Sequence, residues 1–306
     1  MKITFYNRFH RGDIHFSRSF VEHTIRSLHN IRDDIEFSYI HENSADTLSD
    51  IPNLIEIPNQ TITSDIWPDK CMMVVNRSNE DGELSLGINT WIASNDHIFR
   101  SNCGCCFAGN LVMWQMIWKI LDNDHGLKVM PPENPHDLLP KIDYDHYNHC
   151  SFVDDHIKNT DEKYRKRIFV SNGPVLSGQA INFDFDPIIG KVVEENPDCV
   201  FYLTDSTSLE APNIYSTRGL INKDGCDLNE NSYLSTFCDV IIGRASGPFA
   251  YSCCHTNFMD ENKKFCIFTN GVEEGAWFTG GKCNYEWCKS EDIAQVENII
   301  RTSIGE

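Results

Sequence analysis

The chain has 306 residues, of which 41% are hydrophobic and 11% aromatic, which suits two folded domains of roughly 150 residues each rather than a disordered protein. Its formal charge of -19 argues against a nucleic-acid partner, because such contacts depend on clustered Lys and Arg. We find neither a signal-peptide pattern nor a run of about 18 apolar residues, so we expect a cytoplasmic protein without a transmembrane segment. The 13 cysteines are an odd number in apolar surroundings, which indicates reduced core thiols.

The first half of the chain predicts alternating strands and helices. A first strand over 2–6 is followed by a polar loop, and apolar residues then recur at helical spacing from Phe16 to Leu28. Further predicted elements are strands over 35–40, 53–57 and 84–92, and a helix over 110–121. That helix carries only a narrow polar stripe, so we expect it to be almost wholly buried.

The second half shows the same alternation more clearly. The predicted strands are 167–170, 199–203, 239–242 and 264–268, with helices that begin near Asp186, Asp227, Phe249 and Ser290. Strands that alternate with helices favour a parallel, doubly wound sheet. The polar, Pro-containing stretch between about 122 and 166 is typical of a connection between domains. We therefore predict two Rossmann-like α/β domains, 1–160 and 167–306.

The loop after the strand 239–242 is the first candidate site, because ligands of such sheets bind beyond the carboxyl ends of the strands. It contains Arg244, Ser246, Gly247 and Pro248. Ser246 and Gly247 would present N–H groups and a hydroxyl, with no bulky Cβ in the path of a phosphate. An ordinary tight turn with a helix cap is the alternative interpretation.

The surrounding stretch resembles the donor-binding region of GT-B glycosyltransferases. In order, residues 223–228, 238–243 and 246–250 match the family's Gly-containing turn, its Asp-Val-Ile-type strand and its Ser/Thr-Gly-Pro loop. The heptosyltransferase branch is especially similar, although its loop usually reads Asp-Thr-Gly-Pro-Met-His where this chain has Arg244 to Phe249. The resemblance implies two domains that face each other across a cleft. It also implies that the carboxyl-terminal domain binds a nucleotide sugar, with the diphosphate held by the loop 244–248 and by the turn of Asn172 and Gly173.

The loop after the first strand is the second candidate site. Its Gly12-Asp13 pair matches a Gly-Asp pair of the same branch, whose Asp is the proposed base for the acceptor hydroxyl; His10 and His15 are the next candidates for that role. Nearby cations would suit a phosphate or an acidic sugar of the acceptor: Arg8, Arg11 and Arg18. The alternatives are that Asp13 only caps a helix and that the cations form a solvated loop.

These patterns lead to one functional prediction with several rivals. We expect an inverting hexosyl- or heptosyl-type transferase that moves a sugar from a nucleotide-diphosphate sugar to a hydroxyl of a carbohydrate or glycan acceptor, without a metal or other cofactor. Cys103 to Cys106 lack a second ligand pair, and the carboxylates of Asp184-Phe185-Asp186 suit helix capping. The rivals are a fucosyltransferase-like enzyme, suggested by Arg11-Gly12-Asp13, a sugar-nucleotide epimerase or hydrolase of the same fold, and a catalytically silent binding module.

Overall fold

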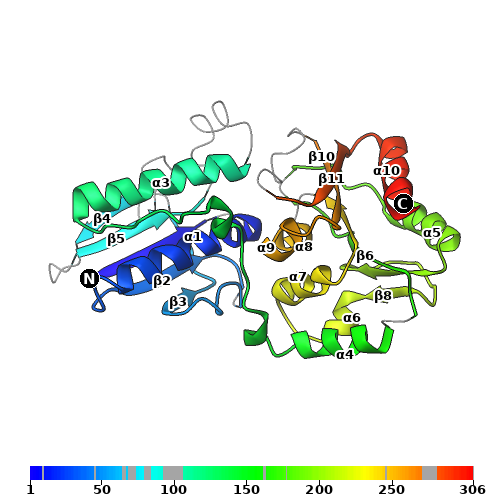
Figure 1. Ribbon diagram of the computed structural model, residues 1–306, viewed down its shortest axis with the longest axis horizontal. Helices are drawn as coiled ribbons and strands as arrows, with labels where there is room; N and C mark the ends of the chain where they lie inside the picture. The colour runs from blue at the N-terminus through cyan, green and yellow to red at the C-terminus, as the bar shows by residue number, and fades with distance from the viewer. Residues whose placement is uncertain are drawn as a thin grey trace. The chain divides into compact units, whose positions relative to one another are not determined.

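A computed structural model describes residues 1–8, 10–44, 46–63, 67, 74–78, 84–91, 106–160, 163–176, 178–244, 247–270 and 281–305. The chain divides into two compact units, Met1–Lys141 and Ile142–Glu306, each built around one sheet (Figure 1). Among the described residues, no helix is long and apolar enough to cross a membrane.

The first unit contains a five-stranded sheet in the order β3-β2-β1-β5-β4. Its strands are β1 (Lys2–Asn7), β2 (Glu36–His41), β3 (Leu54–Ile57), β4 (Val74–Ser78) and β5 (Leu84–Asn89). All neighbours pair in parallel except β4 and β5, which are antiparallel. The direction of successive strand connections reverses between β1 and β5, which is where a Rossmann-like sheet opens a crevice for a ligand.

Aromatic packing joins this sheet to its two long helices, α1 (Arg11–His29) and α3 (Cys106–His125). The ring of Phe20 on α1 contacts Phe5 of β1 edge-on, at 6.1 Å between centroids, and stacks on Trp114 of α3 at 5.4 Å. Such buried rings contribute both apolar area and a defined geometry. They fix α1, and therefore the loop that precedes it, against the carboxyl half of β1.

The prediction that the helix 110–121 is almost wholly buried was wrong. Met113, Trp114 and Trp118 are buried, but Met116 is 39% exposed and Gln115 and Lys119 also face solvent. The apolar residues do recur at helical spacing, but Met116 lies on the outer face of the helix. A methionine can be exposed there because the surface of a folded protein always includes some apolar side chains. The helix therefore covers the sheet from one side only.

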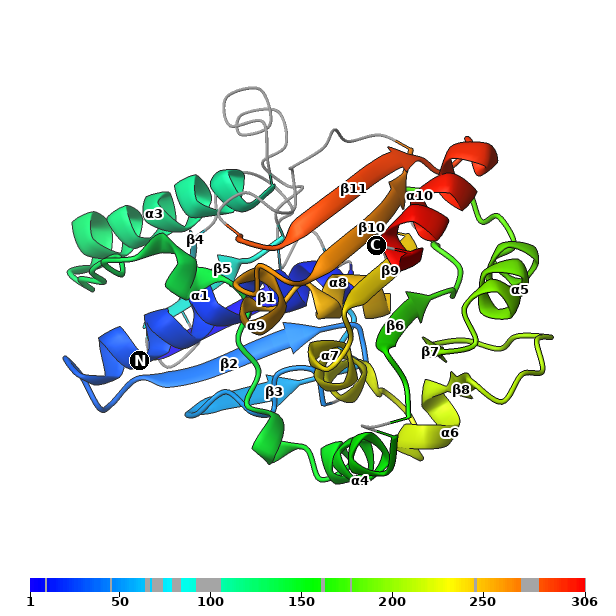
Figure 2. The same ribbon diagram turned by 45° about the vertical axis from the view of Figure 1, so that its right-hand side comes forward.

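The second unit contains a six-stranded parallel sheet in the order β11-β10-β9-β6-β7-β8. Its strands are β6 (Lys166–Ser171), β7 (Cys199–Leu203), β8 (Ile214–Ser216), β9 (Val240–Arg244), β10 (Lys264–Thr269) and β11 (Asn284–Lys289). Figure 2 shows β11, β10, β9 and β6 running side by side. Strand β7 is apolar throughout, and β6 and β9 each contain three consecutive apolar residues, 168–170 and 240–242, because both faces of a parallel sheet are covered.

Helices cover both faces of this second sheet. They are α4 (Cys150–Thr160), α5 (Asp186–Glu195), α6 (Thr217–Ile221), α7 (Leu228–Thr236), α8 (Gly247–Ser252), α9 (His255–Phe258) and α10 (Ile293–Gly305), with the 3-10 turn η3 (Tyr144–His146); another such turn, η2 (Pro135–Leu138), belongs to the first unit. One core cluster joins α5 and α10 to alternate strand residues such as Val170 and Ile242. On the other face, rings on α8 and α9 contact Phe265.

The two units meet in the chain at Lys141 and Ile142 rather than near residue 160. The reason is that α4, which the sequence assigned to the first domain, packs against α6 and α7 of the second unit. In this packing His149 contacts the carbonyl oxygen of Ile221 through Nδ1 (3.0 Å), and the Tyr233 hydroxyl donates to Asp154 (2.7 Å). The polar stretch 122–166 therefore contains both the connection between the units and α4, a helix of the second unit.

Candidate functional site

The second sheet reverses its strand order between β6 and β9. From β6 the chain steps outward to β7 and β8, and from β9 it steps in the opposite direction to β10 and β11. Ser171 and Gly243 are register neighbours at the carboxyl ends of the two strands. Ligands of doubly wound sheets bind outside the carboxyl ends of the strands at this reversal. The candidate site therefore lies where the loops after β6 and β9 leave the sheet.

Asn172 begins the loop after β6 and ties it to the loop after β7. Its side-chain amide donates to the carbonyl oxygens of Asp205 and Ser206, both at 3.3 Å, and its Oδ1 accepts the N–H of Asp205 at 2.8 Å. At Gly173, an added Cβ would lie 3.4 Å from Oδ2 of Asp205. The predicted pair of Asn172 and Gly173 thus lies on a loop that three side-chain hydrogen bonds hold in place.

Arg244 is the last residue of β9, and its side chain contacts the loop of Asn172 and Gly173. Its Nη2 donates to the carbonyl oxygens of Asn172 (2.7 Å) and Gly173 (2.9 Å), and its Nη1 donates to that of Phe183 (2.6 Å). The residue is 2% exposed, and burial lowers the pKa of its guanidinium, an effect that Asp184 partly opposes. The structure therefore brings together three of the predicted donor-site residues.

Gly247 and Pro248, expected in the loop before a helix that starts near Phe249, are instead the first two residues of α8 (Gly247–Ser252), and Ser246 lies outside the described residues. An added Cβ on Gly247 would meet Cδ2 of Leu228 at 3.8 Å, an ordinary contact. The first turns of α7 and α8 are therefore neighbours at the same edge of the sheet.

Glu230 is a residue in this region that the sequence did not single out as a ligand-binding candidate. It is 1% exposed, and its Oε1 accepts a hydrogen bond from Nζ of Lys223 at 2.7 Å. Its Oε2 is buried and has no hydrogen-bond partner within the described part of the chain. In the sequence, Asp227 and Glu230 have the spacing of a capping box, so we interpreted Glu230 as a helix-capping residue. The spacing gives no indication of the buried ion pair of Glu230 with Lys223.

In the first unit, Asp13 lies in the first turn of α1 and is partly buried. The hydroxyl of Tyr39 on β2 contacts Oγ of Ser17 (3.3 Å) and Oγ1 of Thr90 (2.5 Å), next to the carboxyl end of β5. Burial raises the pKa of Tyr39, and the negative charge of Asp13 raises it further. Asp13 is therefore close to a buried hydroxyl cluster at the strand reversal of the first sheet.

The other predicted residues of this loop have different environments. His10 is the exposed residue that precedes α1, Arg8 is half-buried, and Arg11 donates to Oγ of Ser44 at 2.9 Å. His15 is fully buried, with its ring 5.5 Å from that of Phe16.

Arg18 departs from the expectation that it faces an acceptor. It is 1% exposed and pairs with the carboxylate of Asp50. Its remaining donors bind the carbonyl oxygens of Thr47 (2.8 Å) and Lys141 (2.9 Å). Arg18 therefore holds the loop after β2 and the end of the first unit against α1.

Of the two segments considered as metal sites from the sequence, the structure describes Asp184 to Asp186. In Asp184-Phe185-Asp186, the carboxylate of Asp186 accepts bonds from the N–H and hydroxyl of Ser208 and from the hydroxyl of Thr207, all at 2.7–2.8 Å. Burial alone would raise the pKa of Asp186, but these bonds lower it. The Cys103 to Cys105 segment lies outside the described residues. Among the described residues, no group of three or more His, Cys, Asp or Glu could hold a metal, and the described cysteines are free thiols, mostly buried.

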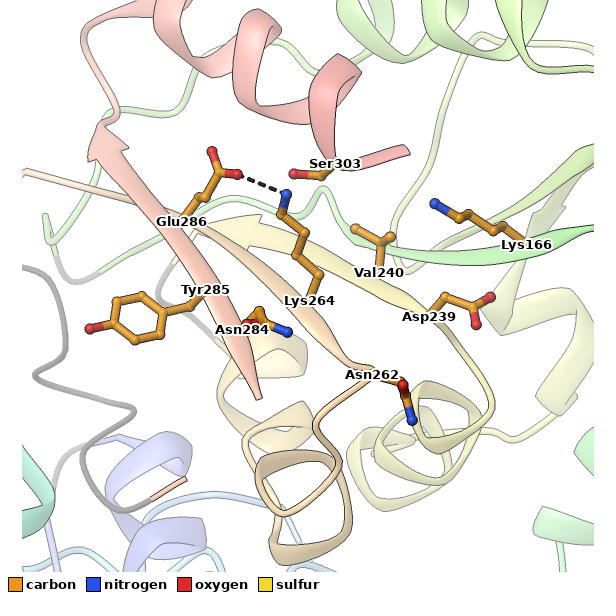
Figure 3. Close-up of a pocket in the computed structure, with 9 residues that line it drawn as sticks. All are labelled: Lys166, Asp239, Val240, Asn262, Lys264, Asn284, Tyr285, Glu286 and Ser303. Carbon is orange, nitrogen blue, oxygen red and sulfur yellow. Dashed lines mark ion pairs between the residues drawn. The ribbon is translucent and has the colours of Figure 1, made fainter. Parts of the chain in front are cut away.

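A polar cavity of about 600 Å³ lies at the opposite, amino-terminal edge of the second sheet (Figure 3). Its two lysines are engaged: Lys166 donates to the carbonyl oxygen of Ile304 (3.1 Å), and Lys264 pairs with Glu286 (2.8 Å). Because ligands of this sheet type bind at the carboxyl ends, this cavity is not part of the candidate site.

Comparisons with known proteins find similarity in structure but not in sequence. No protein-family model and no curated protein matches the chain. The crystal structure of a glycosyl transferase family 9 protein from Veillonella parvula is 11% identical, with 98% of this chain and 89% of that chain covered and a TM-score of 0.51. The E. coli heptosyltransferase WaaC with ADP is 8% identical over 100% of this chain and 97% of that chain, at a TM-score of 0.48. The S. aureus MnaA structure with UDP is 10% identical over 100% and 88%, at 0.49.

The similarity to the Veillonella protein extends over nearly the whole of both chains, and both sheets of this chain have the Rossmann-like form. The predicted fold, two Rossmann-like domains with largely parallel sheets, is confirmed. This chain therefore has the GT-B fold.

Proposed function

We propose that this protein is a glycosyltransferase that moves a hexosyl or heptosyl group from a nucleotide-diphosphate sugar to a hydroxyl of a carbohydrate or glycan acceptor. The observation that carries the proposal is the strand reversal between β6 and β9, where Gly173 lies in the loop after β6 and Gly247 begins α8, the helix after β9. Glycines at such a reversal allow a phosphate to approach the backbone closely. The family 9 fold supports the same class of reaction.

In this proposal the second unit binds the donor. The loop of Asn172 and Gly173 and the turn of Ser246 to Pro248 would hold the diphosphate. Glu230, with a buried carboxylate oxygen that has no partner among the described residues, would accept a hydrogen bond from a hydroxyl of the nucleotide. These contacts would orient the anomeric carbon and stabilise the leaving diphosphate.

The first unit would bind the acceptor. Asp13 would take the proton of the acceptor hydroxyl as that oxygen attacks the anomeric carbon, and the bond to the diphosphate would break with inversion. His10 is exposed and is the next candidate for this base. Arg8 and Arg11, on the same loop, would contact an anionic part of the acceptor. In this scheme Asp13 accepts the proton, and backbone groups of the two loops stabilise the leaving diphosphate. Neither role requires a metal ion, so we propose metal-independent transfer.

The test begins with the donor. Isothermal titration of the purified chain with adenosine, uridine, guanosine, cytidine and thymidine diphosphates should reveal saturable binding of at least one of them. If none binds, the proposal fails. Incubation with the matching nucleotide sugars, with and without EDTA, should then give slow turnover alone and faster release of nucleoside diphosphate with an acceptor library. Rapid conversion of the donor alone would instead identify an epimerase or hydrolase.

A further inference from the structure

Arg244 is a buried cation for which the described part of the chain supplies no ion-pair partner. Its three hydrogen bonds go to uncharged carbonyl oxygens, those of Asn172, Gly173 and Phe183. Its Nε is buried and has no hydrogen-bond partner among the described residues. Since arginine stays protonated in proteins, the positive charge is present and is not neutralised by a neighbouring carboxylate in contact.

The packing around Arg244 makes this charge costly. Its guanidinium carbon lies 5.0 Å from the centroid of the Phe183 ring and 4.8 Å from that of Phe185. Ring contacts and carbonyl bonds recover part of the hydration that burial removes. An isolated buried charge nevertheless remains unfavourable until an opposite charge approaches. The nearby carboxylates of Asp184 and Asp205 belong to exposed residues, where solvent screens them.

The contacts of Arg244 also orient the loop after β6. A trans peptide directs its C=O and N–H in opposite directions. Because the carbonyl of Asn172 points to Arg244, the N–H of Gly173 points away from it. That N–H has no acceptor among the described residues. The next peptide also turns its carbonyl to Arg244, but Pro174 has no N–H to offer.

We propose that Arg244 is the residue that makes the donor site selective for a diphosphate, because its buried charge and the Gly173 N–H that it orients both act on the bound anion. This inference rests on the proposed function, since it assumes that the nucleotide binds where β6 and β9 end. Arg244 is a positioning residue in this account: its Nη groups hold the loop, its charge attracts the anion, and the donor to the phosphate oxygen is the Gly173 amide. The anion, in turn, supplies the opposite charge that the buried guanidinium lacks.

The test compares three ligands on four proteins by isothermal titration: a nucleoside diphosphate that the wild type binds, its monophosphate and its nucleoside. The proteins are the wild type, Arg244→Gln, Arg244→Lys and the control Arg301→Gln. The control removes one positive charge from the same domain, on the exposed side of α10, where Arg301 pairs with Glu195. We expect Arg244→Gln to lose about tenfold or more of the diphosphate affinity and little of the nucleoside affinity. Arg244→Lys keeps the positive charge but lacks the several N–H donors of the guanidinium, so it should lose less of the diphosphate affinity. Arg301→Gln should bind all three ligands as the wild type does.

Equal losses for all three ligands in Arg244→Gln would mean that Arg244 only supports the fold, and the inference would be wrong even though the site binds nucleotides. Failure of the wild type to bind any nucleoside diphosphate would overturn the proposed function and this inference together. If the variants do not fold, the amide resonance of Gly173 in ¹⁵N-labelled wild type replaces them. It should shift with the nucleoside diphosphate and with inorganic pyrophosphate, but not with the nucleoside. An unmoved Gly173 amide in the presence of bound diphosphate contradicts the inference.

Discussion

A Cβ atom on Gly243 would lie 2.8 Å from the Cβ of Ser171 on the neighbouring strand. The same atom would lie 2.8 Å from Cδ2 of Phe249 on α8. Separations below 3 Å between carbon atoms are strongly repulsive. Glycine at 243 therefore allows β6, β9 and α8 to approach one another closely at the edge where the candidate site begins.

The first prediction is that Gly243→Ala destabilises the protein, whereas Gly247→Ala does not. The added methyl at 243 must displace a strand or a ring, and overpacking of this kind costs about 1–3 kcal/mol of the free energy of unfolding. At 247 the methyl would only touch Leu228 at 3.8 Å. Urea denaturation of both variants measures the difference. If both variants have the wild-type midpoint, the close approach of β6, β9 and α8 is not as the structure has it.

The second prediction concerns the ion pair of Arg18 and Asp50, whose side chains are 1% and 3% exposed. Asp50→Ala leaves a buried guanidinium without its carboxylate, which should cost about 3–5 kcal/mol of stability. The exposed pair of Arg32 and Asp34 provides the control. Asp34→Ala should leave the unfolding midpoint nearly unchanged, because solvent screens a surface pair. Comparable midpoints for the two variants would contradict the structural role of Arg18.

Much of the fold could be predicted because local pattern and tertiary environment agree. The strands 199–203 and 264–268 are apolar runs that both faces of the sheet cover, and the structure confirms the first as β7 (Cys199–Leu203). The edge strand β8 (Ile214–Ser216) has three residues, and β4 (Val74–Ser78) pairs antiparallel in a sheet expected to be parallel. Short edge strands carry little periodicity, so the sequence alone does not reveal them.

The candidate site could be predicted only in part, because burial is a property of the folded chain. Asn172, Gly173 and Gly247 were expected at strand ends on the basis of turn chemistry and of a resemblance, and the structure places them there. The sequence gives no indication that Arg18 and Arg244 are buried while Arg11 is only half-buried, since all three are arginines in polar loops or at helix starts. Their roles depend on Asp50 and on the carbonyl of Gly173, which are distant in sequence.

The third prediction is that Gly247→Val abolishes nucleoside diphosphate binding while the protein stays folded. A branched side chain beside the first N–H groups of α8 should hinder a phosphate that approaches the backbone there. The structure has room for a Cβ next to Leu228, and the melting temperature of the variant shows whether a loss of binding comes from unfolding. Isothermal titration and a thermal melt on one preparation measure both quantities. The control is Gly219→Val in α6, where an added Cβ would meet no atom of another described part of the chain within 4 Å. Normal binding by a folded Gly247→Val would place the phosphate elsewhere.

The last prediction tests Asp13 as the general base. Asp13→Asn keeps the size of the side chain but removes the proton acceptor, so the transfer rate should fall by a factor of about 10² or more while donor affinity stays near that of the wild type. If Asp13 serves only the first turn of α1, the outcome differs, because asparagine is about as favourable as aspartate at a helix start. The variant would then keep both its melting temperature and its transfer rate.

Melting temperature, donor affinity and transfer rate measured on one preparation distinguish these two outcomes. Asp137→Asn is the matched control, since Asp137 is an exposed carboxylate of the same unit that pairs with Lys141 at 3.2 Å. It should change none of the three quantities. Near-normal transfer by Asp13→Asn would remove Asp13 from the mechanism. His10 would then be the next residue to replace, because it is exposed at the start of the same helix, whereas His15 is fully buried.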